Sequence, residues 1–178
     1  MALFKKIAAP GKYHDPEAIP NLIAYITRVD KTPSRIIYGS HVDMQDIANS
    51  MIAVSAQFGK NSRLRLHHFI VTFQPKDIRR LDVIPHIAEE ICAYIGRSYQ
   101  IVAALHEDTP SPHIHFVFNA VSFVNGYKMK SVFSGCKGPY NTGISKICSG
   151  VGSSVRLLAR RMASTVVPAA LAISQSPA

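Results

Sequence analysis

The sequence predicts an α+β fold in which helices pack on a mostly antiparallel central sheet. Segments with strand and helix patterns are mixed along positions 1–130, and the last strand segments follow one another through turn signals at 109–112 and Asn125-Gly126. The chain has 178 residues, of which 47% are hydrophobic and 17% are charged. This composition supports one domain of ordinary size with a buried core.

Residues 1–18 are expected to form an N-terminal arm. Pro10-Gly11 and Pro16 interrupt any regular element there. Only residues 4–8 have the composition of a short strand.

The next three elements are predicted from apolar spacing. Apolar residues at 19, 22, 23 and 26 predict a helix over residues 19–27. Residues 35–38 are rich in strand-forming types and end at Gly39-Ser40. Residues 43–58 present one largely apolar face and predict a second helix.

The segments that follow this helix complete the predicted sheet. Residues 67–73 form an aromatic and β-branched run closed by Pro75. Residues 82–94 are amphipathic and predict a third helix ending at Gly96. Strands are then expected at three ranges: 99–106, 113–123 and 127–129.

Residues 131–178 have a different composition. Asp108 is the last acidic residue, and the stretch 109–178 carries seven Lys and Arg, so it contributes +7 of the net charge of +9. Within 131–178, only residues 154–164 have a helical pattern. A basic total favours a polyanionic partner such as nucleic acid.

Other features exclude several classes of protein. Three cysteines are too few for a disulfide scaffold, and their odd number is typical of a reducing compartment. The N-terminus lacks the apolar stretch of a secretory signal, and no stretch has the length of a membrane span. A soluble, cytoplasmic protein without membrane insertion is therefore expected.

Three of the eight histidines lie close together in the sequence, at His106, His113 and His115. His113 and His115 point to the same face of a strand, because side chains alternate with period two. The turn at 107–112 would make the two strands antiparallel, so that His106, at the end of the first strand, lies beside His113 and His115. Three converging imidazoles predict a divalent metal site, with Asp108 orienting one ring from outside the ligand set.

A histidine on a strand is more often a satisfied core or surface residue than a ligand, but a third histidine one turn away favours metal binding. A structural zinc site would need a fourth ligand, for which His67 and His68 are the nearest candidates. One of this pair will face the same sheet surface, and we expect it to contact a phosphate or to lie beside the site.

These residues resemble the motifs of the plasmid mobilisation relaxases, a branch of the single-strand nucleases named for a His-hydrophobic-His pair. The segment from His106 to Asn119 is similar to their third motif, and residues 22–32 are similar to the first. Phe58-Gly59-Lys60 with residues 67–73 is similar to the middle segment. Replication initiators place the tyrosine after the histidine pair, whereas relaxases place it before, as Tyr25 stands here.

The resemblance implies a nuclease domain over residues 19–130 and a tail over 131–178. It also implies that Tyr25 attacks one phosphodiester of single-stranded DNA at a transfer origin and retains the 5′ phosphate. Mg²⁺ or Mn²⁺ on the three histidines would assist, and Asp108 would have a catalytic role. Accessory mobilisation proteins and a coupling protein are the implied partners. The expected DNA-binding residues are Arg28, Lys31, Arg35, Lys60, His68 and Asn119.

Two alternatives remain open from the sequence. A metal-dependent hydrolase would use the same histidines with water as the nucleophile. A non-catalytic nucleic-acid-binding module would stack bases on exposed aromatic residues of the sheet. In the predicted strand, however, Phe116 and Phe118 lie opposite the histidine face, which favours a core position.

Overall fold

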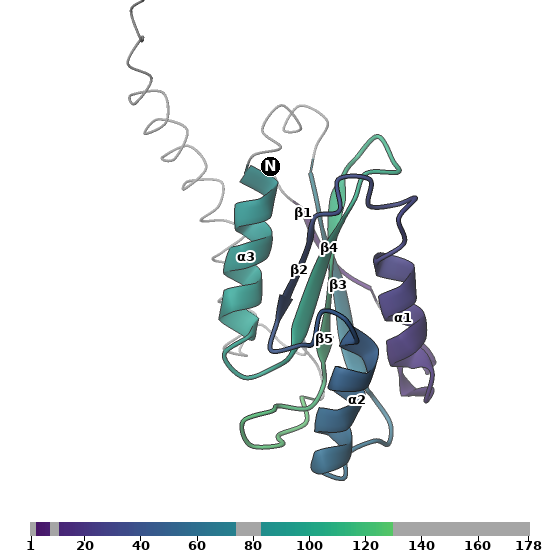
Figure 1. The fold of residues 1–178 in the computed structure, drawn as a ribbon, viewed down its shortest axis with the longest axis vertical. Helices are drawn as coiled ribbons and strands as arrows, with labels where there is room; N and C mark the ends of the chain where they lie inside the picture. The colour runs from purple at the N-terminus through teal and green to yellow at the C-terminus, as the bar shows by residue number, and fades with distance from the viewer. Residues whose placement is uncertain (1–2, 8–10, 74–82, 130–178) are drawn as a thin grey trace, which may run out of the picture.

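A computed structural model describes residues 3–7, 11–73 and 83–129 of the chain. These residues form one five-stranded antiparallel sheet with the strand order β1-β3-β5-β4-β2 (Figure 1). The predicted α+β class is therefore confirmed. The five strands are β1 (Leu3–Lys6), β2 (Ile37–Ser40), β3 (Leu66–Thr72), β4 (Ile101–His106) and β5 (His113–Asn119).

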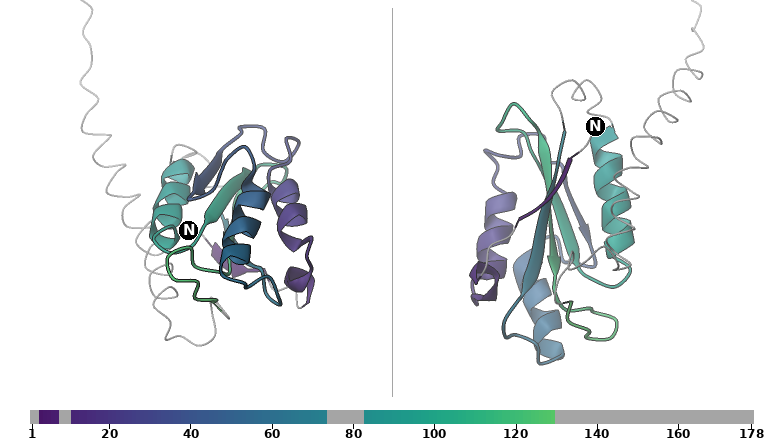
Figure 2. Two further views of the ribbon diagram at one scale, coloured as in Figure 1. Left: turned by 60° about the horizontal axis from the view of Figure 1, so that its bottom comes forward. Right: turned by 180° about the vertical axis from the view of Figure 1, so that it is seen from behind.

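The helices form a layer on each face of the sheet. α1 (Ala18–Ile26) and α2 (Ile47–Gln57) cover one face, and α3 (Val83–Ile95) covers the other (Figure 2). Alternate residues of β5 serve the two layers: Val117 packs with α1 and α2, whereas Phe116 and Phe118 pack with α3. The predicted alternation of side chains along this strand is confirmed.

The centre of the sheet determines which residues meet. β4 and β5 form a hairpin whose last pair is His106 opposite His113, with Ala104 opposite His115. On the other side of β5, β3 places Ile70 opposite His115 and His68 opposite Val117. The histidines of three strand segments thus approach one another on the α1 and α2 face.

Two predicted boundaries differ for local reasons. α2 begins at Ile47 and not at residue 43, because the Asp46 side chain accepts a hydrogen bond from the backbone N–H of Asn49 and caps the helix there. β5 ends at Asn119 and not at residue 123, since the Asn119 side chain accepts from the backbone N–H of Val121 and turns the chain.

The predicted turn at Asn125-Gly126 is present. Gly126 has a φ of 67°, a conformation that favours glycine. The strand expected at 127–129 is reduced to one bridge, between Val121 and Lys128. The helix expected at 154–164 lies outside the described residues.

The N-terminal segment, expected to be an arm, contributes an edge strand to the sheet. β1 pairs with β3 along its whole length, from Leu3 opposite Thr72 to Lys6 opposite Phe69. A short 3-10 helix, η1 (Lys12–His14), follows and buries Tyr13. Across the described ranges, the helices are too short or too polar to cross a membrane.

Candidate active site

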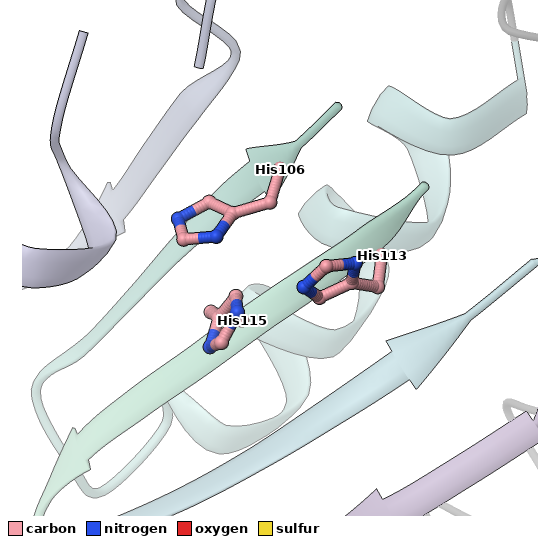
Figure 3. A group of neighbouring side chains, drawn as sticks. All are labelled: His106, His113 and His115. Carbon is pink, nitrogen blue, oxygen red and sulfur yellow. The ribbon is translucent and has the colours of Figure 1, made fainter. Parts of the chain in front are cut away.

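Three histidines of the β4–β5 hairpin converge above one face of the sheet (Figure 3). The ring centroid of His106 lies 4.2 Å from that of His115 and 5.5 Å from that of His113. One ring nitrogen from each residue can be chosen such that all three lie within 4.8 Å of one another. His106 and His115 are buried, and His113 is half-buried.

The second nitrogen of each ring is held by the protein. His106 donates from Nε2 to the carbonyl oxygen of Ile26 at 2.9 Å, and His113 donates from Nδ1 to that of Ser111 at 3.1 Å. His115 pairs through Nδ1 with Nε2 of His68 at 2.8 Å. In a neutral imidazole, a nitrogen that donates leaves the other one as an acceptor.

The remaining ring nitrogens suit a metal ion. Nδ1 of His106 and Nε2 of His115 are buried, and within the described ranges neither has a hydrogen-bond partner. A buried polar atom without a partner is costly unless something else satisfies it. Three converging imidazoles, two of which have an orphaned buried nitrogen, therefore fit a divalent cation.

The protonation states agree with this fit. Burial lowers the pKa of His115 to about 2, with smaller contributions from the charges of His106 and His68. Burial also lowers the pKa of His106. Near neutral pH both rings are uncharged, which leaves their lone pairs free to bind a cation.

Tyr25 lies at the edge of this cluster. It belongs to α1, whose apolar side is buried, but its own side chain is 40% exposed. The ring centroid of Tyr25 lies 5.5 Å from that of His106 and 5.7 Å from that of His115, with both pairs edge-on. The Lys31 ammonium lies 5.5 Å from the centroid of the Tyr25 ring.

The segment after α1 is hydrogen-bonded to the β4–β5 turn. The backbone N–H of Glu107 donates to the carbonyl oxygen of Lys31, and the Glu107 carboxylate accepts from the backbone N–H of Ser34. These contacts join segments that lie far apart in the sequence. They hold the Tyr25 helix against the strand end that carries His106.

Asp108 has a different partner from the expected one. Its carboxylate accepts a hydrogen bond from Lys31 Nζ at 2.5 Å, and this contact lowers the pKa of Asp108. The second nitrogens of the three imidazoles are held by other groups. Asp108 therefore acts on Lys31 and reaches His106 only through the electrostatic field.

The residues expected to bind DNA fall into two groups. Arg28, Lys31, Arg35 and Lys60 are exposed or half-buried. Arg28 is paired with Asp30, and Lys60 donates to the carbonyl oxygen of Gly126 near the far end of β5. Arg28 and Lys31 are closest in sequence to Tyr25.

His68 and Asn119 form the second group, and both are buried. Both ring nitrogens of His68 are hydrogen-bonded to protein groups. Asn119 is fully buried, and its amide is saturated by contacts to Met51, Ser55, Gln100 and Val121. The expectation that Asn119 contacts DNA is corrected: it joins α2 to the sheet.

Sequence reasoning missed two groups. Tyr13 donates to or accepts from Nδ1 of His68 at 2.8 Å and lies in a segment broken by proline and glycine, which offered no signal. The second group is the backbone carbonyl of Ile26, which the residue types in the sequence do not indicate. Burial raises the pKa of Tyr13 to about 12.

A family model described as "Relaxase: MobA/VirD2-like, nuclease domain" matches residues 25–137, a range that begins at Tyr25 and includes the three histidines. Protein TraI of Escherichia coli is 27% identical over 106 residues, which cover 56% of this chain and 14% of TraI. No solved structure matches.

Proposed function

Because this chain belongs to the relaxase family of MobA/VirD2-like nuclease domains, we propose that it nicks single-stranded DNA at a transfer origin with Tyr25 as the nucleophile. The observation that carries the proposal is the packing of the Tyr25 ring against His106 and His115 at 5.5 and 5.7 Å. This packing supports an attack by the phenol on a phosphate bound at the histidine cluster.

The proposed reaction is a transesterification. Oη of Tyr25 forms a bond to the scissile phosphorus, and its proton passes to solvent or to a nearby base. The bond from phosphorus to the 3′ oxygen breaks, and that oxygen leaves as a hydroxyl after protonation. The 5′ phosphate remains on the tyrosine, so a later 3′ hydroxyl can reverse the step and reseal the strand.

His106, His113 and His115 are the residues that would hold Mg²⁺ or Mn²⁺. When bound, such an ion polarises a non-bridging phosphate oxygen and offsets the charge that develops there. The protein's own part is to keep His106 and His115 neutral and all three rings oriented. The Ile26 and Ser111 carbonyls and the His68 ring support this orientation.

A cavity of about 620 Å³ supports a nucleotide substrate. It lies between η1 and α1, and its lining includes Lys12, Leu22, Tyr25 and His115. This volume accommodates a nucleotide next to the scissile phosphate, with apolar groups for the base and a lysine for the backbone.

Charge near the site supports contact with DNA phosphates. Lys31 and Arg28 follow the nucleophile helix directly, and we assign them, with Arg35 and Lys60, to phosphate contacts. The carboxylate of Asp108 holds Lys31, and we propose that it positions the ammonium beside Tyr25.

The extent of the domain and its partners complete the proposal. We propose that the nuclease domain spans residues 19–130, supplemented by β1 and Tyr13, and that 131–178 is a separate tail. The chain spans 14% of the length of TraI. Accessory mobilisation proteins, a coupling protein and a cytoplasmic location are proposed from the family's role in mobilisation.

The test is a covalent-adduct assay with the full chain. Single-stranded origin oligonucleotides are incubated with Mn²⁺ or Mg²⁺ and analysed by denaturing electrophoresis. We expect a protein band shifted by covalent DNA, which Tyr25→Phe abolishes. Tyr127→Phe is the matched control, because Tyr127 is also exposed but lies in the 122–127 turn.

The other outcomes distinguish the alternatives. Cleavage that survives in Tyr25→Phe, with a free 5′ phosphate, would indicate a hydrolase that uses water. DNA binding without any cleavage would indicate a binding module. The burial of Phe116 and Phe118 beneath α3 favours the first two functions over a binding module that stacks bases on these two residues.

A further inference from the structure

A buried hydrogen-bonded chain leads from the N-terminal segment to the histidine cluster. Tyr13 Oη lies 2.8 Å from Nδ1 of His68, and Nε2 of His68 lies 2.8 Å from Nδ1 of His115. All three side chains are buried. These two hydrogen bonds join η1, β3 and β5.

The direction of these hydrogen bonds follows from the cluster. Nε2 of His115 is the buried nitrogen without a partner, so a cation there needs its lone pair. In the neutral ring the proton of His115 must then lie on Nδ1 and be donated to Nε2 of His68. His68 in turn carries its own proton on Nδ1 and donates it to Tyr13 Oη.

We propose that His68 is a positioning residue that holds His115 in the Nδ1–H tautomer, with Tyr13 as the hydrogen-bond acceptor for Nδ1–H of His68. The inference rests on the proposed function, since it concerns a divalent cation on the three histidines. Residues outside a ligand set that orient a ligating imidazole commonly change metal affinity by about 10- to 100-fold.

His115 differs from its two neighbours in this respect. His106 and His113 are oriented by backbone carbonyls, which can only accept a hydrogen bond. A histidine partner can donate or accept at the same nitrogen, so the tautomer of His115 depends on a further residue. That further residue is Tyr13, which contacts Nδ1 of His68. Tyr13 lies before residue 25, where the family match begins, so the contact links the histidine cluster to a segment outside that match.

Packing alone is the competing explanation. The His68 and His115 rings are stacked with centroids 5.1 Å apart, and Tyr13 meets His68 edge-on. Substitutions separate the two explanations. His68→Leu fills space but cannot accept a hydrogen bond, whereas His68→Gln places an amide oxygen within reach of Nδ1 of His115. Tyr13→Phe keeps the ring and removes only the hydroxyl.

The first measurement is Mn²⁺ affinity by calorimetry on the full metal-free chain. We expect His68→Leu to weaken binding by about 10- to 100-fold, and His68→Gln to restore most of the loss. Tyr13→Phe should weaken it by a smaller factor. His67→Leu is the matched control, because His67 is an adjacent buried histidine that stacks on Phe118.

The second measurement is the tautomer of His115 in the metal-free chain, from long-range ¹H–¹⁵N spectra of the histidine rings. The Nδ1–H form should dominate in the wild type and in His68→Gln, and should be lost in His68→Leu. Circular dichroism and thermal melting verify that each variant is folded. This readout tests the inference even if the wild-type chain proves to bind no Mn²⁺, which would count against the proposed function alone.

Two results would overturn the inference. One is a folded His68→Leu variant with wild-type Mn²⁺ affinity and an unchanged His115 tautomer. The other is a His68→Gln variant as weak as His68→Leu, which would assign the effect to ring packing.

Discussion

Nε2 of His106 donates to the backbone carbonyl of Ile26 at 2.9 Å, across 80 positions of sequence. Ile26 is the last residue of α1, where helix carbonyls lack partners within the helix. One hydrogen bond therefore caps α1, fixes the tautomer of a proposed ligand and sets the position of the adjacent Tyr25.

This dual role predicts different effects of two substitutions at His106. Glutamine can still donate to the Ile26 carbonyl, whereas alanine cannot and also leaves a cavity. We expect His106→Ala to lower the free energy of unfolding by about 2 kcal/mol and His106→Gln by less than about 1 kcal/mol. Urea unfolding and Mn²⁺ calorimetry should show that both lose metal affinity. His86→Ala, on the outer surface of α3, should change neither the free energy of unfolding nor the Mn²⁺ affinity. Equal destabilisation by both variants would contradict the capping role.

The buried histidines predict a loss of stability in acid for the metal-free protein. Burial lowers the pKa of His68 to about 4 and that of His115 to about 2, from 6.5. The unfolded chain therefore binds protons below about pH 6.5 that the folded chain does not. Stability is full above this pH and declines as the pH falls towards 4, by up to about 1.4 kcal/mol per pH unit for each histidine. Urea titrations at several pH values measure the slope, which should be shallower in His68→Leu. A flat profile between pH 7 and 5 would contradict the prediction.

The ligand set predicts a preference among metals. Three imidazole nitrogens favour transition ions, whereas Mg²⁺ prefers oxygen ligands, and the nearby Asp108 carboxylate is paired with Lys31. We expect Mn²⁺ to bind at least about tenfold more tightly than Mg²⁺, and Co²⁺ more tightly again. Calorimetry on the metal-free chain tests this order. Equal affinities for Mn²⁺ and Mg²⁺ would indicate an oxygen-rich site instead.

Lys31 is expected to act on DNA binding through its charge. Lys31→Gln should weaken single-stranded DNA binding similarly for all sequences, and should reduce the slope of log K against log salt by about 0.7. Arg97→Gln is the matched control, because Arg97 follows α3 and makes its ring contact with Tyr94 of that helix. Fluorescence anisotropy at several salt concentrations gives both slopes. An equal change of the salt slope in the two variants would show that Lys31 contacts DNA no more than Arg97 does.

Asn119 is expected to matter for stability and not for DNA contact. Its amide oxygen accepts from Ser55 and Val121, and its amide nitrogen donates to Met51 and Gln100. Asn119→Ala leaves several of these buried groups unpaired and should cost about 3 kcal/mol. Ser55→Ala removes a single bond and should cost about 1 kcal/mol. Folded Asn119→Ala protein should bind DNA like the wild type at low temperature, and a specific loss of affinity would restore a role in DNA contact.

Much of the fold follows from periodic patterns within short segments. The apolar positions 19, 22, 23 and 26 are all buried in α1, and the alternation along β5 separates His115 from Phe116 as predicted. The convergence of His106 with His113 also follows, because a short turn between antiparallel strands leaves few registers.

The remaining features depend on long-range contacts that no local pattern encodes. Tyr13 and His68 are 55 positions apart, and nothing around Tyr13 indicates a buried partner. Asn119 has the motif spacing of a site residue but serves the junction with α2. The partner of Asp108 was missed because a carboxylate two residues from a histidine can equally face a lysine brought in by another loop.

The compactness of the ligand set along the chain has a thermodynamic consequence. All three proposed ligands lie within residues 106–115 on one hairpin, whereas Tyr25 comes from a helix far upstream in the sequence. A cation can therefore bind the same three histidines in the unfolded chain, where they remain close neighbours. Ligand linkage gives about 2.7 kcal/mol of stabilisation at a hundredfold excess over the dissociation constant only when the unfolded state does not bind. The stabilisation of this domain by a cation on the three histidines should fall below that value, so the rise in melting temperature would understate the affinity for the cation.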